Sequence, residues 1–296
     1  MKYYALALFF SMALLGCSIP DSSFPSMIPP IFPSVEPTPF AFPTASINAT
    51  PTPTPEPAKL KTWIYQLTGY ENNFDRLLET PSDILVVDAM RQTPDTFFRS
   101  EEVQKLRKKH PTVLAYVSIG EAEDYRYYFI PEWKKNPPTW MGRNNPNWTG
   151  NIKVKYWDPA WQKIILEYVD RVSRIGFDGV YLDIVDGFEY WSDPDTNESE
   201  ILDVDDAALR MIALIRKIRE TGKANNDQFL VFPQNAPELL PYPGYLAAID
   251  GFGKEDLYFN GYNELIKAGS KAAANPDQES QYDVDFLRLM KDAGKT

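Results

Sequence analysis

Short apolar runs alternate with amphipathic stretches along residues 59–296. Several of the runs are apolar at every position and rich in β-branched and aromatic residues, which is typical of buried parallel strands. Since amphipathic stretches lie between most of them, the pattern predicts repeated β-then-α units. The six expected strands are 62–67, 84–88, 113–119, 179–184, 229–232 and 248–252.

Two amphipathic stretches carry helix end signals. In 158–175, Asp158 is a suitable N-cap, Pro159 suits the first turn, and Gly176 follows the last apolar residue. The stretch 205–220 has leucine and isoleucine on one face, and Gly222 is expected to end it. Repeated β/α units over this length favour an α/β fold of the (β/α)₈ TIM-barrel type over a doubly wound sheet. Because only six strands are expected, we expect a barrel truncated after about six β/α units.

The first 58 residues have a different composition. Residues 1–17 combine an early Lys2 with a short apolar run ending in Leu-Leu-Gly-Cys, which resembles a bacterial lipobox and predicts a signal peptide with lipidation at Cys17. Residues 18–58 hold 12 of the 26 prolines, which is typical of a disordered, extended tether. We therefore expect an exported lipoprotein at the outer face of a bacterial envelope, with its folded domain in 59–296.

Composition removes several classes of function. Acidic residues (41) outnumber basic ones (30), and a net charge of −11 disfavours nucleic-acid binding. The single cysteine excludes a disulfide framework. The single histidine, His110, argues against His-based zinc sites and a Ser-His-Asp triad, and its KKHP setting is typical of a helix end before a strand. Any catalysis is therefore expected to depend on carboxylates.

No metal or cofactor is expected. The segment 193–204 begins like a calcium-binding loop, but it has Glu198 where such loops need glycine and Val204 where they need glutamate. We interpret it as a solvated acidic loop that caps the following helix.

Polar residues follow the expected strands at their carboxyl ends, where barrel enzymes carry their active sites. Each strand end supplies a carboxylate, an amide or a phenol, so we expect them to meet at one barrel mouth. They include Tyr65, Asp88, Glu121, Asp183, Asp186, Gln234, Asn235 and Glu255.

The motifs YVSIGEAEDYR, KYWDPAW, GFDGVYLDIVD, VFPQNAPEL and IDGFGKEDLYF resemble, in this order, those of glycoside hydrolase family 114, the endo-α-1,4-polygalactosaminidase-like barrels. The resemblance runs from about Trp63 to Phe259. It implies a TIM barrel, endo-hydrolysis of α-1,4-linked galactosamine polymer and a retaining mechanism. It also implies Asp183 and Glu255 as the catalytic pair, with Asp186 as the weaker rival of Asp183.

The residue types agree with that pair, since a retaining glycosidase needs one ionised carboxylate as nucleophile and one protonated carboxylic acid. The short side chain of Asp183 at a strand end suits the nucleophile, which leaves Glu255 as acid/base. The candidates for sugar binding combine aromatic rings, on which sugar rings stack, with polar groups that form hydrogen bonds to sugar hydroxyls. They are Tyr65, Asp88, Glu121, Asp124, Tyr125, Arg126, Trp157, Tyr181, Asp186, Gln234 and Asn235.

Alternatives remain for three features. Trp157 fits a helix-start packing role as well as a sugar subsite. The segment 122–156, with Trp133, Trp140 and Trp148, fits a lid or cleft wall and equally a packed, inert loop. The whole chain fits a non-catalytic glycan-binding lipoprotein as the alternative to a glycosidase, whereas a solute-binding lipoprotein would need two lobes.

The expected partners follow from these interpretations. We expect a polysaccharide substrate, with a cationic amino sugar favoured by the negative charge of the chain. Membrane contact is expected only through the N-terminal lipid, and the protein is expected to be a monomer.

Overall fold

The computed structural model describes residues 61–70, 72–91, 96–260, 273–274 and 277–296. The signal peptide, Cys17 and the tether expected at 18–58 lie outside the described residues. In the described part, no helix combines the length and apolarity that crossing a bilayer requires.

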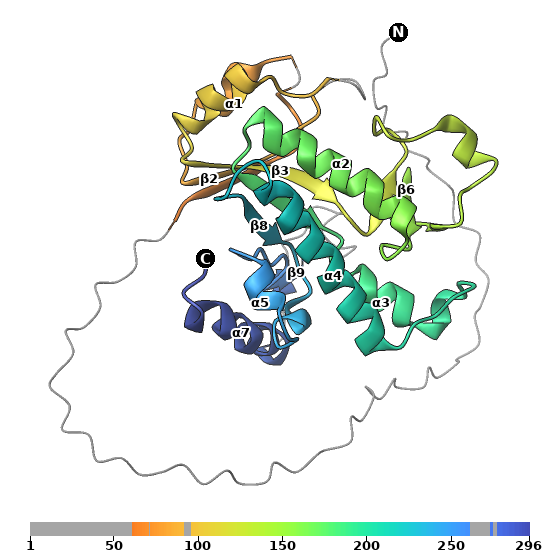
Figure 1. Ribbon diagram of the computed structural model, residues 1–296. Helices are drawn as coiled ribbons and strands as arrows, with labels where there is room; N and C mark the ends of the chain where they lie inside the picture. The colour runs from red at the N-terminus through yellow and green to blue at the C-terminus, as the bar shows by residue number, and fades with distance from the viewer. Residues whose placement is uncertain (1–60, 71, 92–95, 261–272, 275–276) are drawn as a thin grey trace, which may run out of the picture. The chain divides into compact units, whose positions relative to one another are not determined.

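A parallel sheet forms the centre of the folded domain (Figure 1). Its order is β1 (Trp63–Gln66), β2 (Ile84–Asp88), β3 (Thr112–Ser118), β7 (Gly179–Asp183) and β8 (Leu230–Pro233), and each strand pairs in parallel with the next. The α/β fold expected from the sequence is confirmed. Within the described residues the sheet remains open, with β1 at one edge and β8 at the other.

The sixth strand expected at 248–252 was wrong. Ala248 ends the short helix α5 (Tyr245–Ala248), and the following chain meets β8 through one bridge, Gln234 to Gly253. A β-carbon at Gly251 would lie 2.0 Å from the Phe232 ring, and one at Gly253 would lie 2.0 Å from the Tyr181 hydroxyl. The chain thus passes over two aromatic rings at its glycines. It runs beside β8 through separate backbone bonds, from the Asp250 N–H to the Val231 carbonyl at 2.8 Å and from the Gly253 N–H to the Pro233 carbonyl at 2.9 Å, without forming a regular strand.

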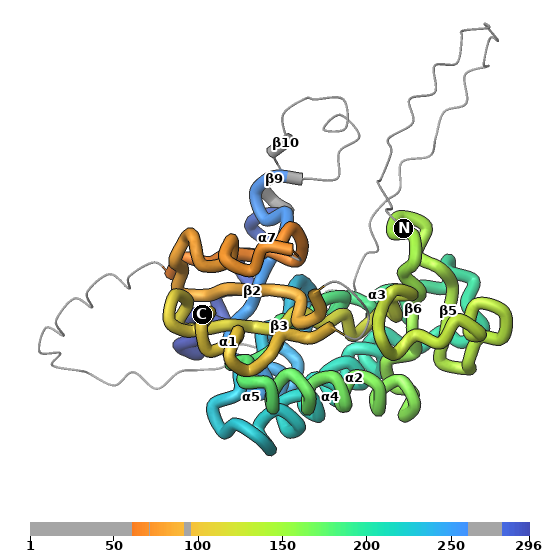
Figure 2. The backbone as a smooth tube through the Cα atoms, turned by 90° about the horizontal axis from the view of Figure 1, so that it is seen from above, coloured from red at the N-terminus to blue at the C-terminus, as the bar shows by residue number. Residues whose placement is uncertain are grey.

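Helices cover one face of the sheet. Figures 1 and 2 show α2 (Pro159–Ile175) and α4 (Val204–Lys223) side by side, and the two are in contact. The predicted ends of α2 are confirmed, since Asp158 Oδ1 accepts from the Ala160 N–H at 2.8 Å and Gly176 has φ +108°. Gly222 was expected to end this helix. It instead lies buried in the last turn of α4, which continues to Lys223.

The remaining elements are short except for the C-terminal helix α7. The helices are α1 (Ser100–Arg107), α3 (Gly187–Ser192) and α7 (Asp277–Asp292), and the 3₁₀ turns are η1 (Phe74–Leu78), η2 (Pro131–Lys134), η3 (Pro194–Thr196) and η4 (Pro237–Leu239). A two-stranded pair joins β9 (Phe259–Asn260) to β10 (Ala273–Ala274), and a second sheet of three strands is described with the site.

Two further predictions are confirmed. His110 lies between α1 and β3, fully buried, with its ring nitrogens bonded to the Ser82 hydroxyl and the Leu77 carbonyl. The acidic segment caps α4, because the Asp203 carboxylate accepts from the Asp205 N–H at 3.0 Å.

The inner face of the sheet determines where the chemistry lies. Its apolar group is Ile84, Val86, Leu114, Tyr116, Tyr181 and Phe232. Since successive strand residues point to opposite faces, Asp183 shares the face of Tyr181 and takes the last position of β7. The fold therefore turns this carboxylate inward, beyond the apolar layer.

The packing at Gly222 gives a test of the fold. An alanine β-carbon at this position would lie 2.0 Å from the Phe229 ring, so Gly222→Ala is expected to lower the free energy of unfolding by about 1–3 kcal/mol. Denaturant unfolding measures the loss. Glu220→Ala, on the exposed side of the same turn, is the control and should change stability by less than about 0.5 kcal/mol. Equal stability of the two variants would contradict this packing.

Candidate active site

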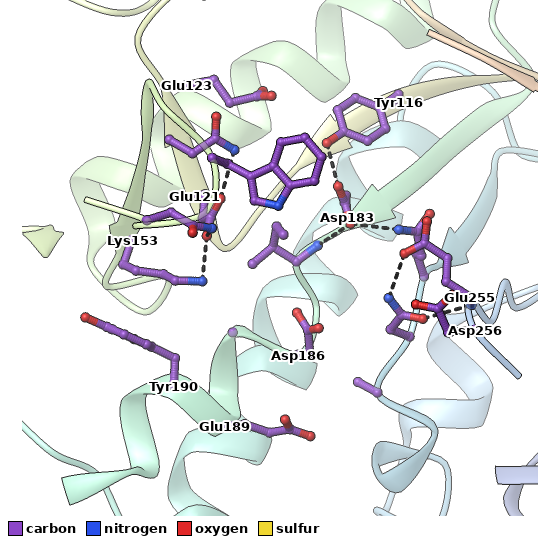
Figure 3. Close-up of a pocket in the computed structure, with 18 of the residues that line it drawn as sticks. Tyr116, Glu121, Glu123, Lys153, Asp183, Asp186, Glu189, Tyr190, Glu255 and Asp256 are labelled. Carbon is purple, nitrogen blue, oxygen red and sulfur yellow. Dashed lines mark hydrogen bonds and ion pairs between the residues drawn. The ribbon is translucent and has the colours of Figure 1, made fainter. Parts of the chain in front are cut away.

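A cavity of about 890 Å³ lies at the carboxyl ends of the central strands. Figure 3 shows Asp183 between two walls, with Glu121 and Lys153 on one side and Glu255 and Asp256 on the other. Eight of the predicted site residues line this cavity. They are Tyr65, Glu121, Tyr125, Asp183, Asp186, Gln234, Asn235 and Glu255.

Asp183 is held by three hydrogen-bond donors. The Tyr116 hydroxyl donates to Oδ2 at 2.5 Å, while the Gln234 side chain and the Ile184 N–H donate to Oδ1 at 3.0 and 2.8 Å. These donors come from β3, from the end of β8 and from the residue that follows Asp183 itself. The carboxylate is therefore fixed in orientation at the end of β7.

The environment of Asp183 changes its acidity. Burial first, and then the negative charges of Asp186 and Glu255, raise the pKa of this carboxyl to about 6, although the bonds from Tyr116 and Ile184 act in the opposite direction. Asp183 is thus ionised at neutral pH and protonated in mild acid.

Glu255 is connected to Asp183 through two consecutive residues. Asn235 donates from Nδ2 to Glu255 Oε2 at 3.1 Å and accepts from the Glu255 N–H at 3.0 Å, while its neighbour Gln234 bonds Asp183. Asn235 and Ala236 have φ of +61° and +57°, so the chain turns sharply here. This turn orients both carboxylates from one short segment.

One wall of the cavity is a small antiparallel sheet of β4 (Glu121–Glu123), β6 (Asn151–Val154) and β5 (Met141–Asn144), in that order. The segment 122–156 is therefore a structured cleft wall, not an inert loop. It supplies seven cavity-lining residues: Glu123, Tyr125, Asn145, Trp148, Thr149, Asn151 and Lys153. Trp140 from the same segment is buried and packs on Trp161 at 5.0 Å between ring centroids.

Glu121 is fully buried and bonded at both oxygens. Lys153 and Asn145 contact Oε1 at 2.5 and 2.8 Å, and Asn151 donates to Oε2 at 2.9 Å. Because these partners belong to the wall, Glu121 holds the wall together. Its carboxylate lines the cavity with its oxygens already engaged.

Asp88 and Arg126 do not line the cavity. Arg126 is buried and donates to both Asp88 oxygens at 2.8 and 2.7 Å and to Glu123 Oε2 at 2.6 Å. Glu123 also accepts the Tyr125 hydroxyl, and the Arg126 guanidinium lies 5.1 Å from the Tyr125 ring. This ion triad therefore fixes Tyr125, which is half exposed on the cavity side.

Three other predicted subsite residues also lie outside the cavity lining. Asp124 pairs with Lys134 at 2.6 Å. Trp157 packs between Tyr156 and Trp191, with centroids 5.0 and 5.1 Å away, which matches the packing alternative. Tyr181 is buried below Tyr65 in the inner layer of the sheet.

Sequence analysis missed several cavity residues. Tyr116 and Ile184 contact Asp183 directly, Lys153 belongs to the wall, and Glu189 and Glu238 enter from α3 and η4. For Tyr116 a signal existed, since it pairs with Tyr181 across the sheet and so faces inward. For the wall, β5 has no apolar alternation, whereas β6 alternates in Asn-Ile-Lys-Val, a short signal that sequence analysis did not use.

The cavity is strongly acidic. Its described lining includes nine aspartates and glutamates and two lysines, Lys153 and Lys254, each of which is paired with a carboxylate. Burial and the nearby Glu238 and Asp186 raise the pKa of Glu189 to about 7. Among the described residues, no group of three or more His, Cys, Asp or Glu is arranged to hold a metal ion.

Comparisons with known proteins agree with this arrangement. The model of glycoside-hydrolase family GH114 matches residues 44–258. Uncharacterized protein MJ1477 of Methanocaldococcus jannaschii is 38% identical over 239 residues, which cover 79% of this chain and 64% of that protein. An uncharacterized protein of Deinococcus radiodurans is 34% identical over 237 residues, which cover 80% of this chain and 72% of its own length.

Among solved structures, the glycoside hydrolase domain of PelA from Pseudomonas aeruginosa has a similar fold. The TM-score is 0.55 at 15% identity, with 79% of this chain and 80% of that domain covered.

Tyr116→Phe tests the geometry around Asp183. Loss of the hydroxyl removes a bond that favours the ionised carboxylate, so the pKa of Asp183 is expected to rise from about 6. Carboxyl ¹³C NMR titration measures this, with the Asp183 signal assigned by its absence in Asp183→Asn. Tyr156→Phe, whose hydroxyl bonds the Ala207 carbonyl away from the site, is the control. An unmoved midpoint in Tyr116→Phe would contradict the geometry.

Proposed function

Since the chain belongs to glycoside-hydrolase family GH114, we propose that it is a retaining glycosidase that cleaves α-1,4-linked galactosamine-type polysaccharide. Asp183 is the nucleophile and Glu255 the general acid and base. The observation that carries the proposal is the placement of these two carboxylates in one cavity, each held by one of the consecutive residues Gln234 and Asn235.

The proposed reaction uses each carboxyl in one role at a time. Asp183 attacks the anomeric carbon while Glu255 donates its proton to the leaving glycosidic oxygen, so that one C–O bond forms as another breaks. Glu255 then takes a proton from water, and that water displaces Asp183 from the sugar. The Tyr116, Ile184 and Gln234 donors hold Asp183 in one orientation through both steps.

The charge of the cavity supports a cationic substrate. Lys153 and Lys254 are each paired with a carboxylate, so the excess acids leave a negative field in the cavity. Such a field raises the local concentration of a sugar with a free amine. Deacetylated galactosamine units fit this field better than acetylated ones.

Incubation of the full chain with deacetylated and acetylated α-1,4-galactosamine oligomers tests the activity, with products identified by mass spectrometry. We expect cleavage, faster for the deacetylated oligomer, and retained anomeric configuration in NMR of the first product. Absence of cleavage of both oligomers, with binding intact, would instead favour a non-catalytic glycan-binding protein.

Asp183→Asn is expected to abolish turnover and yet stabilise the fold. The raised folded-state pKa means that Asp183 contributes stability in acid that is lost as pH rises through about 6. Removing the charge is thus expected to raise stability at pH 8 by up to about 3 kcal/mol, with no gain below about pH 4. Activity assays and unfolding at the two pH values measure both effects. Asp186→Asn is expected to lower kcat much less, and the opposite ranking would transfer the nucleophile to Asp186.

Glu255→Gln completes this test. Its loss of rate should be large for oligosaccharides and smaller for substrates with good leaving groups, which need little protonation. Azide should restore turnover on the latter, because a small anion can replace water in the second step. A variant equal to wild type on oligosaccharides would exclude Glu255 as acid/base.

We also propose that the protein is attached to the outer face of the cell envelope through lipid on Cys17. The proposal rests on the lipobox-like sequence ending at Cys17 and on the proline-rich composition of 18–58. A surface position suits an enzyme whose polymeric substrate is too large to cross a membrane.

Cys17→Ala tests the anchor. We expect wild type in the membrane fraction, with mass spectrometry showing an acylated N-terminal Cys17, and the variant in the soluble fraction. Wild-type protein with an unmodified thiol in the soluble fraction would disprove lipidation.

A further inference from the structure

The residue after Asp183 has a backbone conformation that its side chain disfavours. Ile184 has φ of +56°, in the left-handed region. A β-branched residue is strained there, because its branched Cβ crowds the backbone. Residues held in such conformations persist only where their surroundings enforce them, and they are concentrated at functional sites.

Two glycines surround Ile184. A β-carbon at Gly120 would lie 2.3 Å from the Ile184 carbonyl oxygen and 2.6 Å from its Cγ2, so only glycine fits there. On the other side, the Gly187 N–H at the start of α3 donates to the Ile184 carbonyl at 3.2 Å. The backbone of Asp183 is fixed as well, because its carbonyl accepts from the Ile119 N–H at 3.0 Å.

Ile184 also contacts Asp183 directly. Its N–H, which lies in the peptide plane that joins the two residues, donates to Oδ1 of the Asp183 side chain at 2.8 Å. The titratable groups that act on Asp183 come from β1, β3, β7, the start of α3 and the segment after β8, and they are Tyr65, Tyr116, Tyr181, Asp186 and Glu255. The Ile184 N–H is the donor that depends on backbone conformation alone.

The same contact reaches the cavity wall. The Gly120 carbonyl accepts from the Val154 N–H at 3.2 Å, and Val154 is the last residue of β6. Gly120 also precedes Glu121, which bonds three wall residues. The backbone that encloses Ile184 is thus the backbone from which the wall is built.

We propose that Ile184 is a positioning residue for Asp183, and that Gly120 maintains its left-handed backbone by packing against it. The N–H of Ile184 then fixes the carboxylate in one orientation relative to the cavity wall. The importance of this orientation for turnover rests on the proposed function, whereas the arrangement itself does not.

Gly120→Ala tests the proposal. The added β-carbon displaces Ile184 and its N–H, so the titration midpoint of Asp183 is expected to rise by about one unit. On a cleaved substrate, kcat is expected to fall by about a hundredfold while KM changes little. Carboxyl ¹³C NMR gives the midpoint without any turnover. Gly222→Ala is the matched control, since it overpacks a glycine remote from the cavity and should leave the midpoint unchanged.

A second comparison tests the strain and does not depend on the Gly120 variant folding. Ile184→Gly and Ile184→Ala both remove the branched side chain and keep the N–H. At an ordinary helix or strand position glycine is less stable than alanine by roughly 0.5–1 kcal/mol. At φ +56° the order is expected to reverse, with Ile184→Gly melting at the higher temperature.

Two results would overturn the proposal. One is a Gly120→Ala variant that is folded and destabilised, like Gly222→Ala, but titrates at Asp183 as wild type does. The other is an Ile184→Gly variant less stable than Ile184→Ala. If no glycan is cleaved while both expected results are obtained, the proposed function fails and the positioning role of Ile184 stands.

Discussion

Burying a carboxylate at the end of a central strand is the constraint on which the rest of the site depends. An isolated buried charge is unfavourable, so Asp183 needs donors within reach. They come from both neighbours of β7 in the sheet, through Tyr116 of β3 and Gln234 beyond β8. A slip of one residue in either pairing would turn the donor to the opposite face. The register of the sheet must therefore be correct for the site to form.

The acids near the cavity fall into two groups. Asp88, Glu121 and Glu123 are bonded to Arg126 or Lys153, and their charges are balanced within the walls. Asp183, Asp186 and Glu189 have no ion pair within the described residues, and they face the cavity. Paired acids therefore build the walls, while the others supply the field that a cationic sugar would meet. The ion-paired walls hold the unpaired acids close together despite the repulsion between their charges.

What could be predicted from the sequence depends on whether a feature is set by neighbouring residues or by contacts between distant ones. Five strands, both ends of α2 and the position of Asp183 could be predicted, because they depend on local apolar runs and capping residues. The Asp88–Arg126 pair joins residues 38 positions apart, and no local pattern shows that they meet. Both were placed among sugar-binding candidates, and the structure shows them bonded to each other away from the cavity.

The strands of the wall were not predicted, and the sixth strand was predicted wrongly, for a related reason. β5 is four residues long and lacks apolar alternation, and β6 alternates over only four residues, so both depend on pairing, β6 with β4 and β5 with β6. Conversely, 248–252 has the composition of a strand, but Ala248 ends a helix, and the residues after it meet β8 through separate backbone bonds, with Gly251 packed on the Phe232 ring. Tertiary packing decided both cases.

The two catalytic candidates differ in how the protein treats them. Asp183 is fixed by three donors before any substrate arrives, and burial has already raised its pKa to about 6. Glu255 is exposed, and its side chain is held through Asn235 alone among the described residues. A nucleophile must attack along one line, so its rigidity is useful, whereas an acid/base must donate in one step and accept in the next. A sugar bound in the cavity would cover Glu255 and so supply the enclosure that the protein itself gives only to Asp183.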